Sequence, residues 1–392
     1  MATKRVLLEK IRVPGLVSGA FPPAPQLSLS ESIDQVTRFL SEEPGGKTCI
    51  LTGAGVSVDS GIRAYRGPEG TYTIRKHRPI FYGEFIESEK HRRRYWARSY
   101  LGYPPVRIAD PNPTHYAMSA LMKMNKVCSI ITQNVDGLHH KAHSKDLSTY
   151  LSPPLIPPPP PTEIDSTTST SRIPKLDPPI LELHGTLRHA HCLKCHTPTG
   201  RDEFQDRLSK LNPVWSEYSD SVQSGTIREE KLNPDGDIEL GPNVRYEDFK
   251  VPSCSNCTTR SKGKETGMMK PRVTFFGESL EPLVRRQSEE LINESDRLLV
   301  VGSSLATFSA FRLVRQAKDQ GKKIGLINLG ESRADGIVDF RIGWKGGCRE
   351  IFKGVLENFY QQEQREDVKR EVEEMMKSGK IKTLPKSMRA AS

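Results

Sequence analysis

The stretch TCILTGAGVSVDSG, residues 48–61, decides the fold class of this chain. It opens with an apolar run that lacks polar alternation, which is typical of a strand buried on both faces. Gly53, Ala54 and Gly55 follow at once, and such small residues let the backbone approach a diphosphate at the N-terminus of the next helix. A tight strand-to-helix turn needs glycine even without a ligand, so this turn alone leaves both interpretations open.

The spacing of the glycines narrows the ligand class. Gly61 stands six residues after Gly55, whereas the common dehydrogenase fingerprint places its third glycine three residues after the second. The pattern therefore disfavours an ordinary dehydrogenase.

Three further apolar runs bounded by turn residues repeat the arrangement. They are KVCSIITQN at 126–134, RLLVVGSS at 297–304 and KKIGLINLG at 322–330. Segments with helical periodicity, such as 28–44 and 310–320, alternate with these runs, which predicts an α/β fold with a parallel sheet covered on both faces. Ligands bind at the carboxyl ends of such strands, so the glycines, hydroxyls and amides that follow them indicate one crevice for a dinucleotide.

The composition excludes several classes of protein. Lysine and arginine exceed aspartate and glutamate by ten in 392 residues, but much of this excess lies in runs such as HRRRYWARS, which favours a generic basic surface over specific nucleic-acid binding. No apolar run reaches the roughly 18 residues that cross a bilayer, so we expect no membrane span. Seven cysteines, an odd number, argue against a secreted disulfide framework and indicate a reducing or organellar interior.

Four of the cysteines form two Cys-x-x-Cys pairs. They are Cys192, Cys195, Cys254 and Cys257. Four thiolates at this spacing predict a closed tetrahedral zinc site that is structural, because no coordination position stays open for chemistry. A redox-active pair is the competing interpretation, but two pairs in one chain, each in a polar loop, favour zinc.

Composition also divides the chain into parts. We expect a leader over 1–27, which is either a targeting segment or plain disordered chain, and a charged tail over 359–392. The nucleotide-binding domain is expected in two parts, 28–185 and 268–358, with the metal module and its polar insertion over 186–267 between them. The first part contains a helical segment at 70–105 and a proline-rich insertion at 144–179, for which we expect disorder.

His184 ends the apolar run ILEL and stands eight residues before the first cysteine pair. From its position alone it is a metal ligand, a catalytic base or a core side chain.

The order of these motifs resembles that of the sirtuin (Sir2) family, the NAD-dependent protein deacylases. The motifs are GAGVSVDSGIRAYRG, TQNVDGLHHKA, LELHG, the two cysteine pairs, KPRVTFFGE, VGSSLATFSAF and NLG, across roughly residues 30–355. RYWARSYLGYP and GCRE are similar to the class II group, most closely to the mitochondrial sirtuin-four type. The resemblance implies a Rossmann-like doubly wound parallel sheet with a small zinc-binding domain, and NAD and an acyl-lysine peptide that meet between them.

The resemblance also implies roles for individual residues. The expected NAD-binding residues are Gly53, Ala54, Gly55, Ser57, Gly61, Arg66, Gln133, Asn134, Val135, Asp136, Gly302, Ser303, Ser304, Asn328, Leu329, Gly330 and Cys348. Asn134 and Asp136 are expected to take part in catalysis by positioning the ribose and a water or the carboxamide. His184 matches the catalytic histidine, a base rather than a fifth metal ligand, because the four thiolates complete the zinc shell.

The mechanism implied by the family has two stages. The acyl oxygen of the modified lysine displaces nicotinamide at the ribose C1′ and gives an alkylamidate. His184 then deprotonates a ribose hydroxyl, which attacks the amidate carbon, and water completes the release of free lysine and O-acyl-ADP-ribose. A neutral imidazole, with an unperturbed pKa near 6.5, can accept that proton.

Two features qualify the resemblance. The usual Pro-Asp of the family is here Arg63-Ala64, and we expect slower turnover or altered nicotinamide inhibition rather than loss of NAD binding. Tyr95 and Arg98 have the Tyr-x-x-Arg spacing of class II relatives that accept acidic acyl groups, which an arginine fork matches. The alternative is that this run is a solvated helix face.

Two other functions stay open at this point. A mono-ADP-ribosyltransferase would use the same NAD cleavage with a different acceptor, and a non-catalytic NAD-sensing module would need no base. The expected partners are acylated-lysine proteins, and we expect a monomer without specific nucleic-acid or membrane binding. The resemblance favours the mitochondrial matrix, with a nuclear or cytoplasmic location as the alternative.

Overall fold

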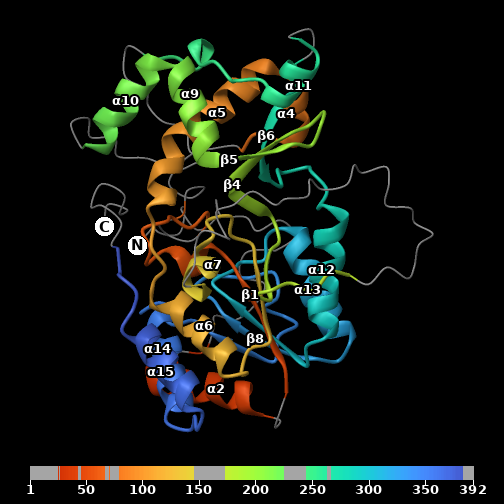
Figure 1. The fold of residues 1–392 in the computed structure, drawn as a ribbon. Helices are drawn as coiled ribbons and strands as arrows, with labels where there is room; N and C mark the ends of the chain where they lie inside the picture. Colours follow the sequence, from red (N-terminus) through yellow and green to blue (C-terminus); the bar gives the residue numbers. More distant parts are fainter. Residues whose placement is uncertain are drawn as a thin grey trace, which may run out of the picture.

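The computed structural model describes residues 25, 27–42, 46–66, 70, 79–144, 173–224, 244–262 and 266–382. They form a larger domain built on a sheet, and a smaller domain that lies above it in Figure 1. Most of the predicted leader and proline-rich insertion, part of the polar insertion and the end of the predicted tail lie outside the described residues. No helix in the described ranges is long and apolar enough to span a bilayer.

The larger domain has a six-stranded sheet in which every neighbouring pair of strands is parallel. In spatial order the strands are β3 (Ile180–Glu182), β2 (Ser129–Thr132), β1 (Thr48–Thr52), β7 (Arg297–Val301), β8 (Lys323–Ile327) and β9 (Phe340–Ile342). The predicted parallel α/β sheet is thereby confirmed. The strand order reverses between β1 and β7, and ligands of such sheets bind beyond the carboxyl ends of the strands at that point.

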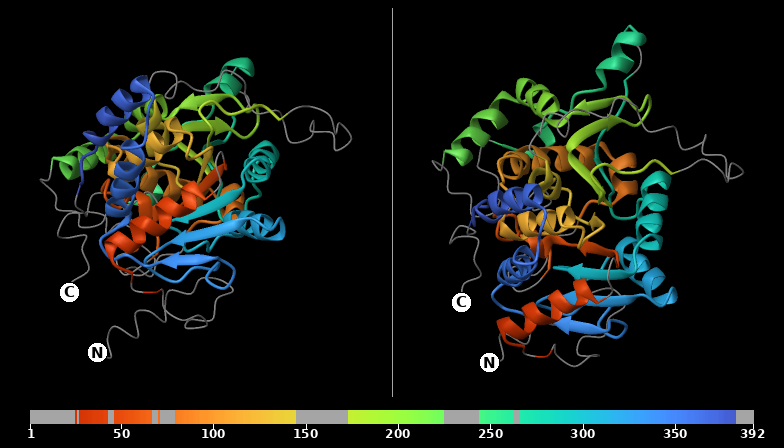
Figure 2. Two further views of the ribbon diagram at one scale, coloured as in Figure 1. Left: turned by 90° about the horizontal axis from the view of Figure 1, so that it is seen from below. Right: turned by 60° about the horizontal axis from the view of Figure 1, so that its bottom comes forward.

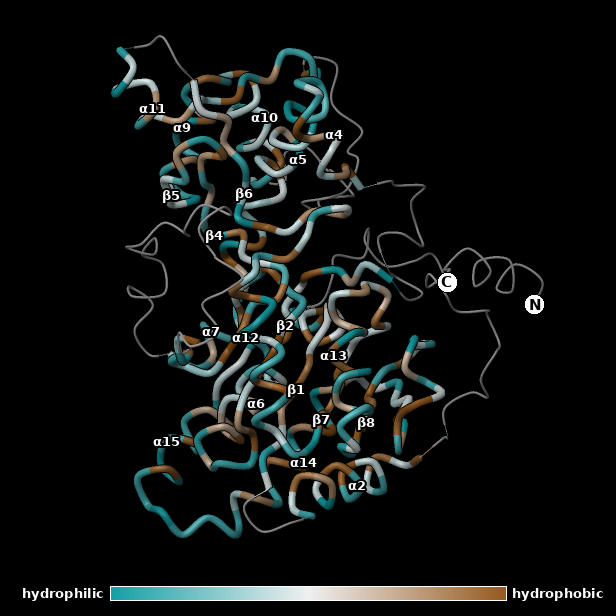
Figure 3. Tube along the Cα trace, turned by 90° about the vertical axis from the view of Figure 1, so that its right-hand side faces the viewer, coloured by the Kyte–Doolittle hydropathy of each residue, from teal (hydrophilic) through white to brown (hydrophobic). Residues whose placement is uncertain are grey.

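Helices cover both faces of this sheet (Figure 2). On one face lie α2 (Leu29–Ser41), α6 (Pro113–Lys123), α14 (Cys348–Tyr360) and α15 (Glu366–Met376); on the other lie α12 (Pro282–Asn293) and α13 (Phe308–Asp319). Successive residues of β1 point to opposite faces, so Ile50 packs with the first group and Leu51 with the second. Figure 3 shows hydrophobic and hydrophilic stretches alternating along the helices that cover the sheet.

The smaller domain surrounds a three-stranded antiparallel sheet of β4 (Gly185–Cys192), β5 (Pro198–Gly200) and β6 (Met269–Val273). The helices around it are α4 (Tyr82–Glu87), α5 (Glu89–Arg107), α9 (Arg201–Leu211), α10 (Pro213–Gln223), η2 (Tyr246–Asp248) and α11 (Ser255–Arg260). Strand β6 lies beyond the expected boundary at 267, and α5 packs in this domain although the sequence pattern assigns its residues to the first part of the larger domain. Aromatic packing explains this, because Trp96 of α5 lies 4.6 Å from Phe204 of α9 between ring centroids.

The start of the predicted charged tail is structured. Its helix α15 buries Val372 and Met375 against the larger domain. Lys123 of α6 forms an ion pair with Glu371 at 2.8 Å. Beyond α15 the chain returns to the loop after β1, where the amide of Lys382 donates to the carbonyl of Asp59 at 2.7 Å. The larger domain also contains two short helices, η1 (Ala54–Ser57) after β1 and α7 (Leu138–His143) after β2.

Candidate functional site

The glycine-rich loop after β1 lies directly against the loop after β7. The amide of Gly55 donates to the carbonyl of Gly302 at 3.0 Å, and a Cβ on Gly55 would lie 2.8 Å from the Cα of Gly302. This approach demands glycine whether or not a diphosphate binds. The helix that follows is η1, a single 3-10 turn of four residues.

A hydrogen-bonded network joins this loop to the end of β2. The side-chain amide of Asn134 donates to the carbonyl of Gly53 and to the Ser57 hydroxyl, both at 3.1 Å. The Ser57 hydroxyl donates to Asp136 at 2.8 Å, and the amide of Leu138 donates to the other carboxylate oxygen at 3.0 Å. Burial raises the pKa of Asp136, and these two donors oppose that rise. The side chain of Ser57, 79 positions away in the sequence, and a neighbouring backbone amide thus hold this carboxylate in place.

Gln133 connects β2 to the loop after β7. Its side-chain amide donates to the Ser303 hydroxyl at 2.7 Å, and the Thr307 hydroxyl donates to its side-chain oxygen at 3.4 Å. Both segments are thereby fixed at the carboxyl end of the sheet.

His184 lies in the turn between β3 and β4, where the two domains meet. Its Nδ1 is 3.1 Å from the carbonyl oxygen of Gln133, and its Nε2 is 2.7 Å from the hydroxyl oxygen of Ser309. Loss of solvent around the imidazole lowers its pKa to about 4, so the ring is neutral at physiological pH. A neutral, oriented imidazole is suited to accept a proton.

The other expected NAD-binding residues lie around the same end of the sheet. The loop after β8 meets the loop after β7 through the amide of Arg333, which donates to the carbonyl of Ser304 at 3.0 Å. In that loop the Asn328 side chain donates to the carbonyl of Gly330 at 2.8 Å, and Leu329 is 54% exposed.

The remaining residues of the set lie on the loop after β1, after β2 and at the start of α14. Gly61 has a φ of +82°, Arg66 is half-buried, and the carbonyl of Val135 accepts from the amide of Leu187 at 3.0 Å. Cys348 begins α14, and burial raises the pKa of its thiol to about 12. That thiol is therefore protonated and inert at neutral pH.

Tyr95 and Arg98 lie on α5 and are buried, at 9% and 3% exposure, so they are not part of a solvated helix face. The ring centroid of Tyr95 is 4.8 Å from that of Phe275. The neighbouring Thr274 donates its amide to the carbonyl of His184 at 2.9 Å. Phe275 and Thr274 therefore link Tyr95 to His184.

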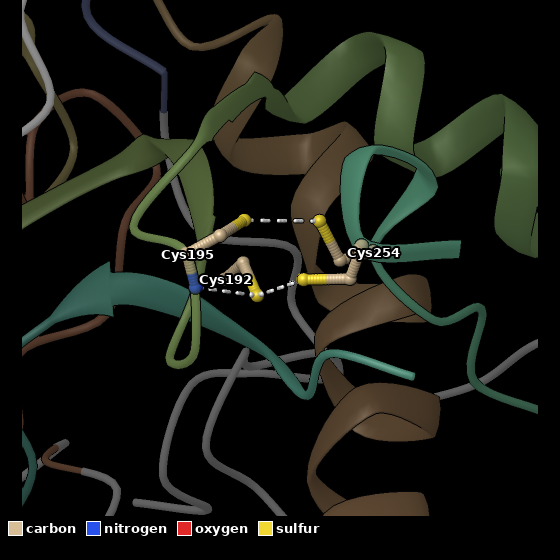
Figure 4. Close-up of side chains that lie close together, drawn as sticks. Cys192, Cys195 and Cys254 are labelled. Carbon is tan, nitrogen blue, oxygen red and sulfur yellow. Dashed lines mark hydrogen bonds between the residues drawn. The ribbon is translucent and has the colours of Figure 1, made fainter. Parts of the chain in front are cut away.

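The four cysteines converge in the smaller domain. Their sulfur atoms lie within 4.8 Å of one another, with 3.7 Å between Cys192 and Cys257 and 3.6 Å between Cys195 and Cys254. Figure 4 shows the sulfurs of the labelled cysteines turned toward one another. Tetrahedral zinc with Zn–S bonds of about 2.3 Å places its ligand sulfurs about 3.8 Å apart. The sulfurs therefore fit the predicted structural zinc.

Backbone groups around the cluster also suit thiolate ligands. The amides of Lys194 and Cys195 donate to the sulfur of Cys192 at 3.3 and 3.4 Å. A Cβ on Gly267 would lie 2.4 Å from the same sulfur, so this glycine keeps the chain close to the cluster.

Two polar residues of the site were not expected from the sequence. Thr307 and Ser309 contact Gln133 and His184, respectively. Both lie in VGSSLATFSAF, where only the first serines follow the strand directly. The signal available was a second pair of hydroxyls at the start of the following helix.

The fold and the site together define a two-domain nucleotide-binding protein, with a doubly wound sheet, a neutral histidine at the strand ends and a four-thiol module. The chain belongs to the Sir2 family, whose model matches residues 53–150 and 175–309. The predicted family is thereby confirmed.

Curated relatives match most of the chain. The "NAD-dependent protein deacylase SIR4" of Batrachochytrium dendrobatidis is 38% identical over 319 residues, 80% of this chain and 91% of that protein. The "NAD-dependent protein deacylase SRT2" of Arabidopsis thaliana is 39% identical, over 83% of this chain and 76% of that protein. The "NAD-dependent protein lipoamidase sirtuin-4, mitochondrial" of Homo sapiens is 32% identical, over 84% of this chain and 88% of that protein.

Solved structures share the fold. One described as "Sir2-p53 peptide-NAD+" has a TM-score of 0.54 at 21% identity and covers 86% of this chain and 99% of its own. The expected Rossmann-like sheet with a small zinc-binding domain is confirmed.

Proposed function

We propose that this chain is an NAD-dependent protein-lysine deacylase that releases nicotinamide and O-acyl-ADP-ribose. The observation that carries the proposal is the neutral imidazole of His184, hydrogen-bonded to Gln133 beside the network of Asn134 and Asp136. The names of the curated relatives support the same activity.

In this proposal, separate groups of residues bind the dinucleotide, orient its ribose and transfer the proton. The loop at Gly53–Gly55 and the loops after β7 and β8 bind the dinucleotide, and Asn134 and Asp136 orient the ribose and the carboxamide or a water. NAD supplies the ribose carbon from which nicotinamide departs. His184 takes the proton of a ribose hydroxyl at Nε2, while Nδ1 keeps its proton on the carbonyl of Gln133. The four cysteines hold a structural Zn2+ that fixes the smaller domain and takes no part in proton transfer.

The acyl group is acidic in this proposal. Arg98 would pair its guanidinium with the terminal carboxylate of a succinyl or glutaryl group, and Tyr95 would assist. Support comes from the burial of both side chains and from the contact of Tyr95 with Phe275. Low solvent access strengthens such a charge-assisted pair.

The proposed location is the mitochondrial matrix, and the proposed partners are acylated-lysine proteins there. Relatives from Homo sapiens and Bos taurus carry "mitochondrial" in their names, which supports the location. The protein acts as a monomer in this proposal.

The decisive experiment follows nicotinamide release and peptide mass together. Wild type and His184→Ala receive NAD with acetyl-, succinyl-, glutaryl- and lipoyl-lysine peptides. Acyl loss by wild type, reduced about 100- to 10,000-fold in His184→Ala, is expected for a general base. ADP-ribosylated protein without acyl loss would replace the proposal with ADP-ribosyl transfer, and NAD binding with neither product would leave a sensing role.

A further inference from the structure

We propose that Ser309 is a positioning residue for His184, which fixes the ring orientation of the imidazole and yields Nε2 to the substrate hydroxyl. The inference rests on the proposed function, because it assigns a role within the same proton transfer.

The hydrogen bond between Nδ1 and the carbonyl of Gln133 determines the tautomer of His184, and the bond to Ser309 is compatible with it. The carbonyl of Gln133 can only accept, so Nδ1, at 3.1 Å from it, must carry the proton of the neutral ring. Nε2 then presents a lone pair, and the Ser309 hydroxyl donates to it at 2.7 Å. Partners on both sides of the ring hold its orientation about the Cβ–Cγ bond.

Ser309 is itself held in place by the start of α13. Thr307 caps this helix, since its carbonyl accepts from the amide of Phe311 at 3.1 Å, and its hydroxyl donates to the side chain of Gln133 at 3.4 Å. Gln133 is thus bound through its carbonyl to His184 and through its side chain to the helix that carries Ser309. Three hydrogen bonds, together with the covalent chain from Thr307 to Ser309, thus link His184, Gln133 and the start of α13.

The backbone before α13 supports a constrained placement. Leu305 has a φ of +53°, which is unfavourable for a side chain with a Cβ, yet it is fully buried. Its amide donates to the Ser303 hydroxyl at 3.1 Å. Backbone strain of this kind persists where the surroundings dictate the conformation, and it clusters at functional sites. The turn that aims Ser309 at His184 is therefore not an adaptable loop.

In this proposal the Ser309 hydroxyl occupies the lone pair of Nε2 only until the substrate binds. When the substrate hydroxyl arrives at Nε2, the serine hydroxyl leaves that lone pair. The O–H bond of the substrate breaks, an N–H bond forms at Nε2, and the imidazole becomes a cation whose Nδ1–H stays on Gln133. Ser309 keeps its own proton throughout.

The test separates the two stages of the reaction. Nicotinamide exchange, followed with labelled nicotinamide, requires no base, whereas net deacylation does. Ser309→Thr keeps a hydroxyl, and Ser309→Val has the shape of the threonine variant without the hydroxyl. Ser309→Ala is a second variant that lacks the hydroxyl. All are measured on the full chain with zinc bound, with His184→Ala as the reference for a lost base.

We expect Ser309→Val and Ser309→Ala to lose about 3- to 10-fold in the kcat/KM of deacylation, because the imidazole of the free enzyme is no longer held on its Nε2 side, with exchange unchanged. Ser309→Thr should retain both rates. A wild-type rate of deacylation in Ser309→Val and Ser309→Ala would overturn the inference. An equal fall in the rates of exchange and deacylation would also overturn it, because it indicates a structural role. Wild type without exchange or deacylation on any peptide would instead overturn the proposed function.

Discussion

Gly55 and Gly302 meet backbone to backbone, with 3.0 Å between the amide nitrogen of Gly55 and the carbonyl oxygen of Gly302. The contact joins the loop after β1 to the loop after β7, and the strand order reverses between these two strands. It allows no side chain on Gly55, because the Cβ would lie 2.8 Å from a backbone carbon.

Gly55→Ala should therefore lower the free energy of unfolding by about 1–3 kcal/mol, the usual cost of overpacking, and weaken NAD binding as the loops separate. Thermal unfolding and NAD titration measure the two effects. Gly83→Ala is the matched control, since its Cβ has no neighbour within 4 Å and it lies inside α4, where alanine is the better helix former. Equal stability of the two variants would contradict the prediction.

Arg98→Lys should reduce the proposed preference for acidic acyl groups. Lysine keeps the charge but loses the planar fork, so the ratio of kcat/KM for succinyl- over acetyl-lysine should fall by about tenfold or more. Because both substrates are measured on the same variant, the ratio is independent of any general loss of activity in that variant. Arg93→Lys is the control, because Arg93 pairs with Glu89 on the exposed side of α5 and should leave the ratio unchanged. An unchanged ratio in Arg98→Lys would exclude this arginine as the acyl receptor.

Cys257→Ser should abolish zinc binding and unfold the smaller domain, because folding and metal binding are coupled in such modules. Zinc content and tryptophan fluorescence report the two events, as Trp96 and Trp215 both lie in that domain's core. Cys128→Ser, in the larger domain, should keep its zinc and its fluorescence. Retained zinc in Cys257→Ser would disprove the four-thiolate site.

Stability should fall as pH drops from about 6.5 toward 4. Burial lowers the pKa of His139 to about 4 from 6.5, so the unfolded chain binds more protons than the folded chain in that window. The stabilisation is complete above pH 6.5 and is lost on acidification; half-buried His184, with its pKa also near 4, adds to the same trend.

Thermal unfolding against pH, at saturating zinc, tests this sign. His139→Gln should flatten the slope between pH 6.5 and 4, because it removes one group that is protonated only on unfolding. A slope identical to wild type would show that His139 does not contribute.

Truncation after Ser378 should weaken NAD binding. The removed segment includes Lys382, whose amide donates to Asp59 at 2.7 Å and whose ammonium lies 3.1 Å from Asp110, and which pairs with Ser60 in a short parallel bridge. We expect an increase of about 3- to 10-fold in the Kd for NAD, since the loop after β1 loses one or two hydrogen bonds. Truncation after Lys382 keeps these contacts and should bind as the full chain does.

The sequence by itself determined the features that depend on local pattern. Apolar runs such as TCILT at 48–52 must be buried on both faces, and their alternation with helices requires a parallel sheet. The spacing of the four cysteines constrains them to a closed metal site, and the motif around His184 places it at a strand end. Each of these inferences needs only neighbours in the chain or a repeated pattern.

Tertiary structure decided the contacts between segments distant in sequence. Nothing within α5 shows that its aromatic face packs on α9, or that Arg98 is buried while nearby Arg93 is not. The helix α15 was visible as a charged segment, but its contact with α6 was not. The hydroxyl of Ser309 reaches His184 across 125 positions of sequence. Such contacts depend on how the faces of separate elements pack, and local sequence patterns carry no record of which faces will meet.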